Sequence, residues 1–220
     1  MPKLGMEPLR RMDTINATLE CIYEHGIDHI TLDMVAAKAG FSKGVVAYYF
    51  KSKKNLVLES LKAFLAAYNL KIGASIKAGL HPLDMVKTIV EVALPPLTDT
   101  NQETINVSTL EGADKIRLPQ ERIAKIFIQF ISMASIDEDL KNIMVENYTK
   151  DVSGIALLMQ HAQKEYPSAD FDDMNAAYAL LAMIYGLSFF RINHFMPLGD
   201  KDNRKIAFDY INRLFGISLS

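Results

Sequence analysis

The segment Thr31–Asn55 constrains the fold of this chain more than any other, because it places two short helical patterns around a tight Gly-Phe turn. Thr31 can cap the first helix through its hydroxyl, and apolar residues follow on one face at spacings of three and four. Gly40 can adopt the positive φ at which a helix ends and the chain reverses. Ser42 can then cap the second helix. The segment therefore predicts a helix-turn-helix, a motif that binds DNA.

The second helix of this motif has an inward and an outward face. Val45, Val46 and Phe50 are expected to pack inward. The outward face is small and polar, so its backbone and side chains can both approach base edges in the major groove. We expect this face to hold Lys43, Gly44, Ala47 and Tyr49, with the first three facing bases.

A lysine run follows the second helix, at Lys51, Lys53 and Lys54, where ammonium groups can neutralise phosphates beside the groove. Tyrosine hydroxyls just before the run can donate to the DNA backbone. We assign phosphate contacts to Thr31, Ser42, Tyr48, Tyr49 and Lys53. The alternative is a helical hairpin with a solvated lysine run and no role in nucleic-acid binding.

These residues resemble the TetR family of one-component transcriptional regulators. The resemblance follows the order of parts: a helix ending near His25-Gly26, the helix after Thr31, Ala39-Gly40-Phe41-Ser42, Tyr48-Tyr49-Phe50, and Lys53 with Asn55-Leu56. The opening MPKLGMEPLRR and the later INATLECIYEHG resemble, more narrowly, the repressors of choline-to-glycine-betaine genes. The resemblance implies a homodimeric repressor that binds a palindromic operator in double-stranded DNA and is released by a small-molecule effector.

Composition and charge agree with two domains. Half of the residues are hydrophobic, enough for a sizeable core. We expect a helix-turn-helix domain at residues 1–55 and a helical effector-binding and dimerisation domain at 56–220. The net charge is −2, but residues 1–55 carry eight Lys and Arg against six Asp and Glu, whereas the remainder carries 16 against 20. This asymmetry is typical of a chain of which only one end meets DNA.

No membrane or targeting segment is expected. No apolar run reaches the roughly 18 residues that span a bilayer, and charged residues interrupt the opening segment where a signal peptide has its apolar core. Cys21 is the only cysteine, so no disulfide can form within the chain and a reducing cytoplasm is the expected location.

The rest of the chain predicts an all-α fold. One apolar stripe continues from Leu56 to about Gly79, and prolines end a short helix at Leu83–Leu94. Two further helices are expected at Gln120–Ala134 and from about Asp137 to Glu165. The segment 98–118 is the least periodic, and we expect a long loop or irregular helix near a pocket mouth.

Two apolar-faced helices are expected at the C-terminus, at Phe171–Phe195 and Asp200–Phe215. Paired with the same helices of a second copy, they would form a four-helix dimer contact. The alternative is that they close the core of the monomer itself.

Aromatic residues gather in the C-terminal three quarters of the sequence. Rings can hold a quaternary ammonium such as choline through cation-π attraction, although aromatic residues at helical spacing also form ordinary cores. The eleven methionines would suit a pliable pocket for a hydrophobic effector instead. The candidate effector-binding residues are Phe127, Phe130, Tyr148, Tyr185 and Phe189.

Neither catalysis nor a cofactor is expected. The five histidines lack metal-ligand spacing, and no Gly-rich phosphate loop or nucleophile elbow occurs. A helical enzyme built from scattered residues, or a pure interaction scaffold, stays as the alternative class. Both leave the lysine run and the small-residue helix face unexplained.

Overall fold

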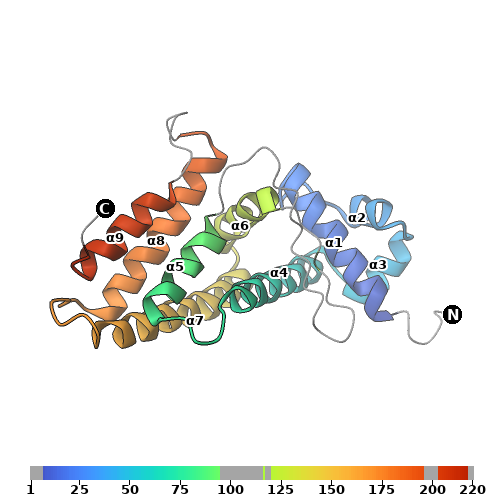
Figure 1. Cartoon of the computed structure of the whole chain (residues 1–220). Helices are drawn as coiled ribbons and strands as arrows, with labels where there is room; N and C mark the ends of the chain where they lie inside the picture. The colour runs from blue at the N-terminus through green and yellow to red at the C-terminus, as the bar shows by residue number, and fades with distance from the viewer. Residues whose placement is uncertain (1–6, 95–115, 117–119, 196–202, 218–220) are drawn as a thin grey trace. The chain divides into compact units, whose positions relative to one another are not determined.

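The computed structural model describes residues 7–94, 116, 120–195 and 203–217, and these residues form helices and short connections without a strand (Figure 1). The all-α prediction is confirmed. The helices are α1 (Glu7–His25), α2 (Leu32–Ala39), α3 (Lys43–Phe50), α4 (Lys53–Ser75), α5 (Pro82–Ala93), α6 (Gln120–Ala134), α7 (Glu138–Gln163), α8 (Asp173–Ile192) and α9 (Arg204–Leu214). The expected irregular segment 98–118 lies outside the described residues except for Ile116.

The ends of α2 form as the sequence predicts. The Thr31 hydroxyl accepts a hydrogen bond from the Met34 backbone N–H at 3.2 Å, which satisfies one of the free amides of the first turn. Gly40 ends the helix in the left-handed conformation with φ at 71°. Ser42 occupies the cap position of α3, but its hydroxyl makes no capping hydrogen bond.

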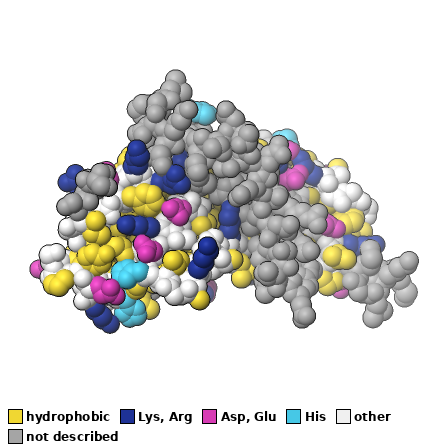
Figure 2. All heavy atoms as spheres, in the orientation of Figure 1, with side chains coloured by type: hydrophobic (Ala, Val, Ile, Leu, Met, Phe, Trp, Pro, Cys, Tyr) yellow, Lys and Arg dark blue, Asp and Glu magenta, His cyan; other side chains and the backbone are white. Residues whose placement is uncertain are grey.

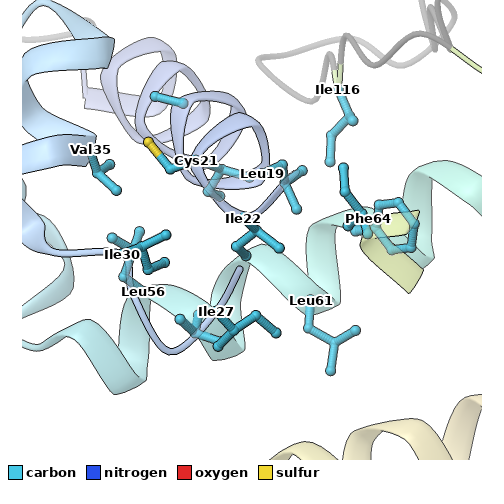
Figure 3. Packing of buried hydrophobic residues seen from close by; sticks show 14 of the residues in the cluster. Leu19, Cys21, Ile22, Ile27, Ile30, Val35, Leu56, Leu61, Phe64 and Ile116 are labelled. Atoms are coloured by element: carbon cyan, nitrogen blue, oxygen red, sulfur yellow. The ribbon is translucent and has the colours of Figure 1, made fainter. Parts of the chain in front are cut away.

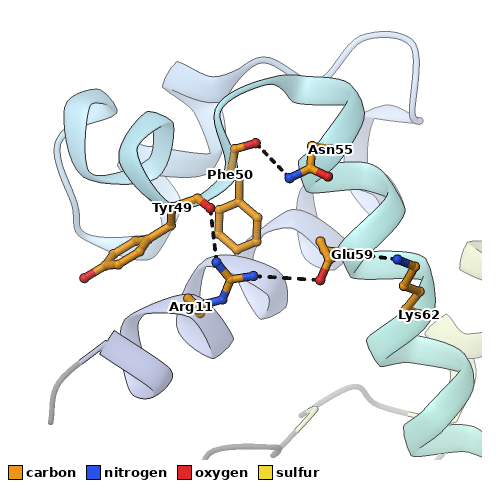
Figure 4. Close-up of polar contacts among 6 residues, drawn as sticks. All are labelled: Arg11, Tyr49, Phe50, Asn55, Glu59 and Lys62. Atoms are coloured by element: carbon orange, nitrogen blue, oxygen red, sulfur yellow. Dashed lines mark hydrogen bonds and ion pairs between the residues drawn. The ribbon is translucent and has the colours of Figure 1, made fainter.

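A sharp turn joins α3 to α4, and the sequence did not predict the structural role that Lys51, Ser52 and Asn55 have in it. Lys51 takes a positive φ of 64°, a conformation that residues other than glycine adopt only when their surroundings enforce it. The Ser52 hydroxyl accepts from the Asn55 amide at 3.1 Å and thereby caps α4. The Asn55 side chain donates to the Phe50 carbonyl at 3.0 Å, closing the turn (Figure 4).

By packing, the chain divides into two compact units. Unit 1 comprises residues 1–71 and 101–144, and unit 2 comprises 72–100 and 145–220. The division therefore falls inside α4 and inside α7. Packing does not define function, so the functional boundary expected after residue 55 stays a prediction.

The core of unit 1 is built on α1 and α4. Leu19 and Ile22 of α1 and Leu61 of α4 are fully buried, and Ile27 packs with them from the loop after α1 (Figure 3). Each such side chain contributes about 1.5–3 kcal/mol when it leaves water. This core fixes the end of the unit that carries α2 and α3.

The core of unit 2 is formed by α5, α7, α8 and α9. Ala176 and Ala177 are buried on α8 where it packs against α9, and the Tyr210 hydroxyl of α9 donates to the Ala176 carbonyl at 3.2 Å. With a mean hydropathy of 1.3, α8 is the one described helix long and apolar enough to cross a membrane. Helices in the cores of soluble proteins pass the same test, and six α8 residues lie in the unit 2 core.

Candidate nucleic-acid interface

The helix-turn-helix is formed by α2 and α3, with α1 packed against α2. On α3, Val46 and Phe50 are completely buried, as expected. Lys43 and Gly44 are exposed and Ala47 is partly exposed. The face expected to meet bases is therefore open to solvent.

One orientation was predicted incorrectly. Tyr49 was expected on the outward face, but only 7% of its surface is exposed. It follows Val46 by three residues, and residues at that spacing share one side of a helix, so Tyr49 lies on the buried side. Tyr48 is 69% exposed, and its ring meets Tyr49 edge-on at 5.3 Å between centroids. Of the two tyrosines, Tyr48 is the one placed to reach a phosphate.

Arg11 of α1 braces the end of α3 and was not predicted (Figure 4). Its Nη1 donates to the Tyr49 carbonyl at 3.1 Å, and its guanidinium carbon lies 4.8 Å from the centroid of the Phe50 ring. Its Nη2 is 3.8 Å from a Glu59 carboxylate oxygen on α4. A cation at a helix C-terminus satisfies carbonyls that lack partners within the helix. Arg11 thus joins three helices at the base of the interface.

The three lysines after α3 differ in the intramolecular partners of their ammonium groups. Lys53 donates to the Asp28 carbonyl at 2.8 Å. Lys54 lies 2.6 Å from Asp139 and 3.4 Å from Asp137, and these carboxylates raise the pKa of its ammonium. Lys51 is exposed, and no ion pair to it occurs within the described part of the chain. Lys51 is therefore more available to a phosphate than Lys53, to which the sequence assigned that role.

Lys43 also has an intramolecular partner. Its ammonium lies 2.8 Å from an Asp33 carboxylate oxygen of α2, and about three fifths of each side chain is exposed. Exposed pairs of this kind contribute about 0–1 kcal/mol. A nucleic-acid ligand can therefore displace Asp33 at little cost.

Gly44 has no evident role within the protein. A Cβ atom added there would meet only the Ser42 hydroxyl, at an ordinary contact distance of 3.9 Å. Glycine inside a helix costs roughly 0.5–1 kcal/mol relative to alanine. Close approach by an external surface would account for a glycine here.

The five candidate effector residues are divided between the two units, with two of them in unit 1. Phe130 is completely buried in the core of unit 1, and its ring centroid lies 6.0 Å from that of Phe64. Phe127 lies 6.2 Å from the same ring. These two therefore follow the alternative of ordinary core packing.

The other three candidates lie in unit 2. Tyr148 and Tyr185 are 5.9 Å apart between centroids, and Tyr178, which was not among the candidates, joins them. Phe189 is 41% exposed and groups with Phe190 and Phe195. Composition shows that aromatic residues are abundant, but only tertiary packing determines which of them meet.

Charge on unit 2 is mixed. The face seen in Figure 2 intersperses Lys and Arg with Asp, Glu, His and hydrophobic side chains, without a single-sign patch among the residues coloured there. Over the described ranges, no group of three or more His, Cys, Asp or Glu side chains is arranged to hold a metal ion.

Comparison with known proteins supports the assignment of the N-terminal motif. Residues 15–60 match the model of the family described as bacterial regulatory proteins, tetR family. An HTH-type transcriptional regulator BetI from Agrobacterium fabrum is 36% identical over 93 residues, which cover 42% of this chain and 45% of the relative. A BetI from Cronobacter sakazakii is 38% identical over 88 residues, covering 40% and 42%. The chain thus spans less than half the length of these curated relatives.

Solved structures match over nearly the whole chain. A putative TetR-family regulator from Rhodococcus sp. has a TM-score of 0.74 at 19% identity, covering 94% of this chain and 98% of that one. A putative transcriptional regulator from Saccharomonospora viridis in complex with choline has a TM-score of 0.72 at 16% identity, covering 94% and 95%. At these identities the likeness establishes the fold. The chain therefore carries the N-terminal DNA-binding domain of the tetR family at residues 15–60, within a helical fold shared with TetR-family regulators.

Proposed function

We propose that the chain is a ligand-responsive transcriptional regulator, a repressor that binds a palindromic operator as a homodimer. The observation that carries the proposal is the exposed, small face of α3. Arg11 binds the C-terminal end of this helix, and the exposed Lys51 follows it. In this proposal residues 1–55 bind DNA, residues 56–220 bind the effector and the second copy, and the protein acts in the cytoplasm.

The proposed DNA contacts are of two kinds, contacts to base edges and contacts to phosphates. Lys43, Gly44 and Ala47 face base edges, where a small helix surface permits close approach. The phosphate contacts come from Thr31, Ser42, Tyr48, Lys51 and Lys53, with Lys53 first leaving the Asp28 carbonyl. The two reading heads of the dimer would meet successive major grooves, roughly 34–36 Å apart.

The exposed face of α8 supports the proposed dimer. Opposite its buried side, α8 exposes the small residues Ala179 and Ala182 together with Phe190, which is 45% exposed. On α9, Ile206 is 41% exposed. A helix that is apolar on both sides is typically buried on both sides. A second copy packed on α8 and α9 would cover these residues.

The effector is proposed to lower DNA affinity by favouring a conformation in which the two heads no longer match the operator. A coupling of about 1–3 kcal/mol corresponds to a 5- to 150-fold change. The BetI relatives and the choline complex of the Saccharomonospora neighbour support choline or a related compound as the effector. A neutral hydrophobic effector is the alternative.

The test is fluorescence anisotropy of the full chain on labelled DNA flanking its own gene, at two salt concentrations, with and without choline. Selective, salt-sensitive binding is expected. Lys51→Ala should weaken binding on every fragment and reduce the salt slope by about 1, whereas Lys164→Ala, an exposed lysine of unit 2, should leave both unchanged. If neither the flanking DNA nor any sequence from a random pool is bound selectively, the proposal fails.

A further inference from the structure

A cavity of about 190 Å³ that opens to solvent lies within unit 1, where three segments of the chain meet. The loop between α1 and α2 contributes Ile27 and Asp28, and the first two turns of α4 contribute four more residues. The other walls come from the end of α6 and the start of α7. A cavity of about 150 Å³ accommodates one benzene molecule, so this one has room for a compound with a single ring.

Most of the wall of this cavity is apolar. Five of the nine lining residues have hydrocarbon or thioether side chains, and these are Ile27, Val57, Leu58, Met133 and Leu140. Ile27, Val57 and Leu140 are buried, so they belong to the core of unit 1 and form fixed walls. Such a cavity favours a ligand with a hydrocarbon body over a fully hydrated ion.

Two of the charged groups on the wall already offset each other. The Lys54 ammonium lies 3.4 Å from Asp137 and 2.6 Å from Asp139. The other oxygen of the Asp137 carboxylate, Oδ1, accepts from the Leu140 backbone N–H at 3.1 Å and so caps α7. These groups therefore have their own partners and leave little charge for a ligand.

Lys53 differs from Lys54 because its partner is neutral. Its Nζ donates to the Asp28 carbonyl at 2.8 Å, and over the part of the chain that the structure describes no carboxylate forms an ion pair with it. An ammonium has three N–H donors, so two stay available. Asp28 itself is exposed, where water and salt screen its carboxylate. Lys53 thus supplies an ammonium without a carboxylate partner at the edge of an apolar cavity.

We infer that this cavity binds a small monocarboxylate with a compact hydrocarbon body, such as an aromatic carboxylic acid. The ring would occupy the apolar space, and the carboxylate would accept charge-assisted hydrogen bonds from Lys53. This ligand is an anion, and so differs from the choline-like or neutral effector of the proposed function. If the chain also binds DNA as proposed, the ligand would engage a lysine that contacts phosphate and would therefore weaken DNA binding.

The test is isothermal titration calorimetry of the full chain, without DNA, with benzoate and two analogues. Benzamide has the same ring without the charge, and acetate has the same charge without the ring. Benzoate should bind at least about tenfold more tightly than either analogue, because the site recognises both the ring and the charge. Equal affinity of benzoate and either analogue, or no binding of benzoate, would overturn the inference.

Variants then assign the binding to Lys53. Lys53→Met keeps a side chain of similar length without the charge and should weaken benzoate binding at least about tenfold. Lys62→Met removes the same charge from an exposed position on α4 that does not line the cavity, and it should leave benzoate affinity unchanged. Circular dichroism verifies that both variants are folded. Parent-like affinity in a folded Lys53→Met variant contradicts the site.

The methionine methyl groups locate the ligand in the unchanged protein. In spectra of protein with ¹³C-labelled methionine methyls, the Met133 resonance should shift as benzoate is added, whereas that of Met159, buried in unit 2, should not. A shift of Met159 without a shift of Met133 would place the ligand elsewhere and refute the site. Since neither measurement involves DNA, benzoate binding at Met133 without selective DNA binding supports this site and refutes only the proposed regulator.

Discussion

Replacing Gly44 with alanine should make the protein more stable and its DNA binding weaker. The added Cβ meets only the Ser42 hydroxyl at 3.9 Å, and Gly44 is not among the glycines with a positive φ, so the folded chain accepts alanine without strain. Gly44 lies in the first turn of α3, where the helix penalty of glycine is at the lower end, about 0.5 kcal/mol. For a chain of this size, that corresponds to a rise in Tm of about 1–2 °C.

The effect on DNA has the opposite sign. If the α3 face lies against base edges, a methyl group at position 44 separates the two surfaces and removes neighbouring contacts. We expect at least about a tenfold loss of affinity, which equals about 1.4 kcal/mol. Urea unfolding gives the first quantity and fluorescence anisotropy on the selected operator gives the second.

Gly73→Ala is the matched control. Gly73 is exposed in the last turn of α4, its φ is not positive, and a Cβ there meets nothing within 4 Å. It should give a similar small stabilisation and unchanged DNA affinity. If Gly44→Ala binds the operator as tightly as the parent, then α3 does not approach DNA at that residue. If Gly44→Ala lowers the free energy of unfolding, the added Cβ strains the folded chain at that position.

Three further predictions follow from the contacts. Asp139→Asn removes the nearer of the two carboxylates that bind Lys54 and should strengthen DNA binding by about two- to fivefold at low salt, measured by anisotropy; an unchanged affinity would show that Lys54 does not reach DNA. Arg11→Ala should lower the free energy of unfolding by about 1–2 kcal/mol, and Arg11→Lys should restore only part of it, because a lysine lacks the fork that reaches two partners. Because the Asp151 carboxyl has a raised pKa, its ionised form opposes folding, so parent stability should increase as pH falls through about 6 towards 4. Asp151→Asn should be more stable than the parent at pH 8 by about 1–2 kcal/mol, after allowing for partial exposure, and should match it near pH 4 in urea titrations.

Local chemistry made much of the N-terminal motif predictable. The Thr31 cap and the positive φ at Gly40 depend on residue type and on the few residues around them, so the sequence alone indicates them. The orientation of the Tyr49 side chain was harder to predict, because this residue lies between an exposed and a buried neighbour at the end of an eight-residue helix. If the boundary of the buried face of α3 is misplaced by one residue, Tyr49 is predicted to be exposed instead of buried.

Tertiary contacts were not predictable in the same way. Arg11 reaches a carbonyl 38 residues away, and nothing in its own neighbourhood of the sequence indicates that partner. The same holds for Phe130, whose ring packs on Phe64 in unit 1, and for Tyr178, which joins Tyr148 in unit 2. Aromatic content predicts that rings will cluster, but not which rings.

The two carboxylates that hold Lys54 also affect how the salt dependence of DNA binding should be interpreted. Binding that recruits this ammonium must first break its contact with Asp139, which leaves a carboxylate that gathers cations from solution. That uptake offsets part of the counterion release from DNA. The number of phosphate contacts inferred from the salt dependence of affinity would then be smaller than the number of lysines that contact the DNA backbone. Neutralising Asp139 would reduce this difference.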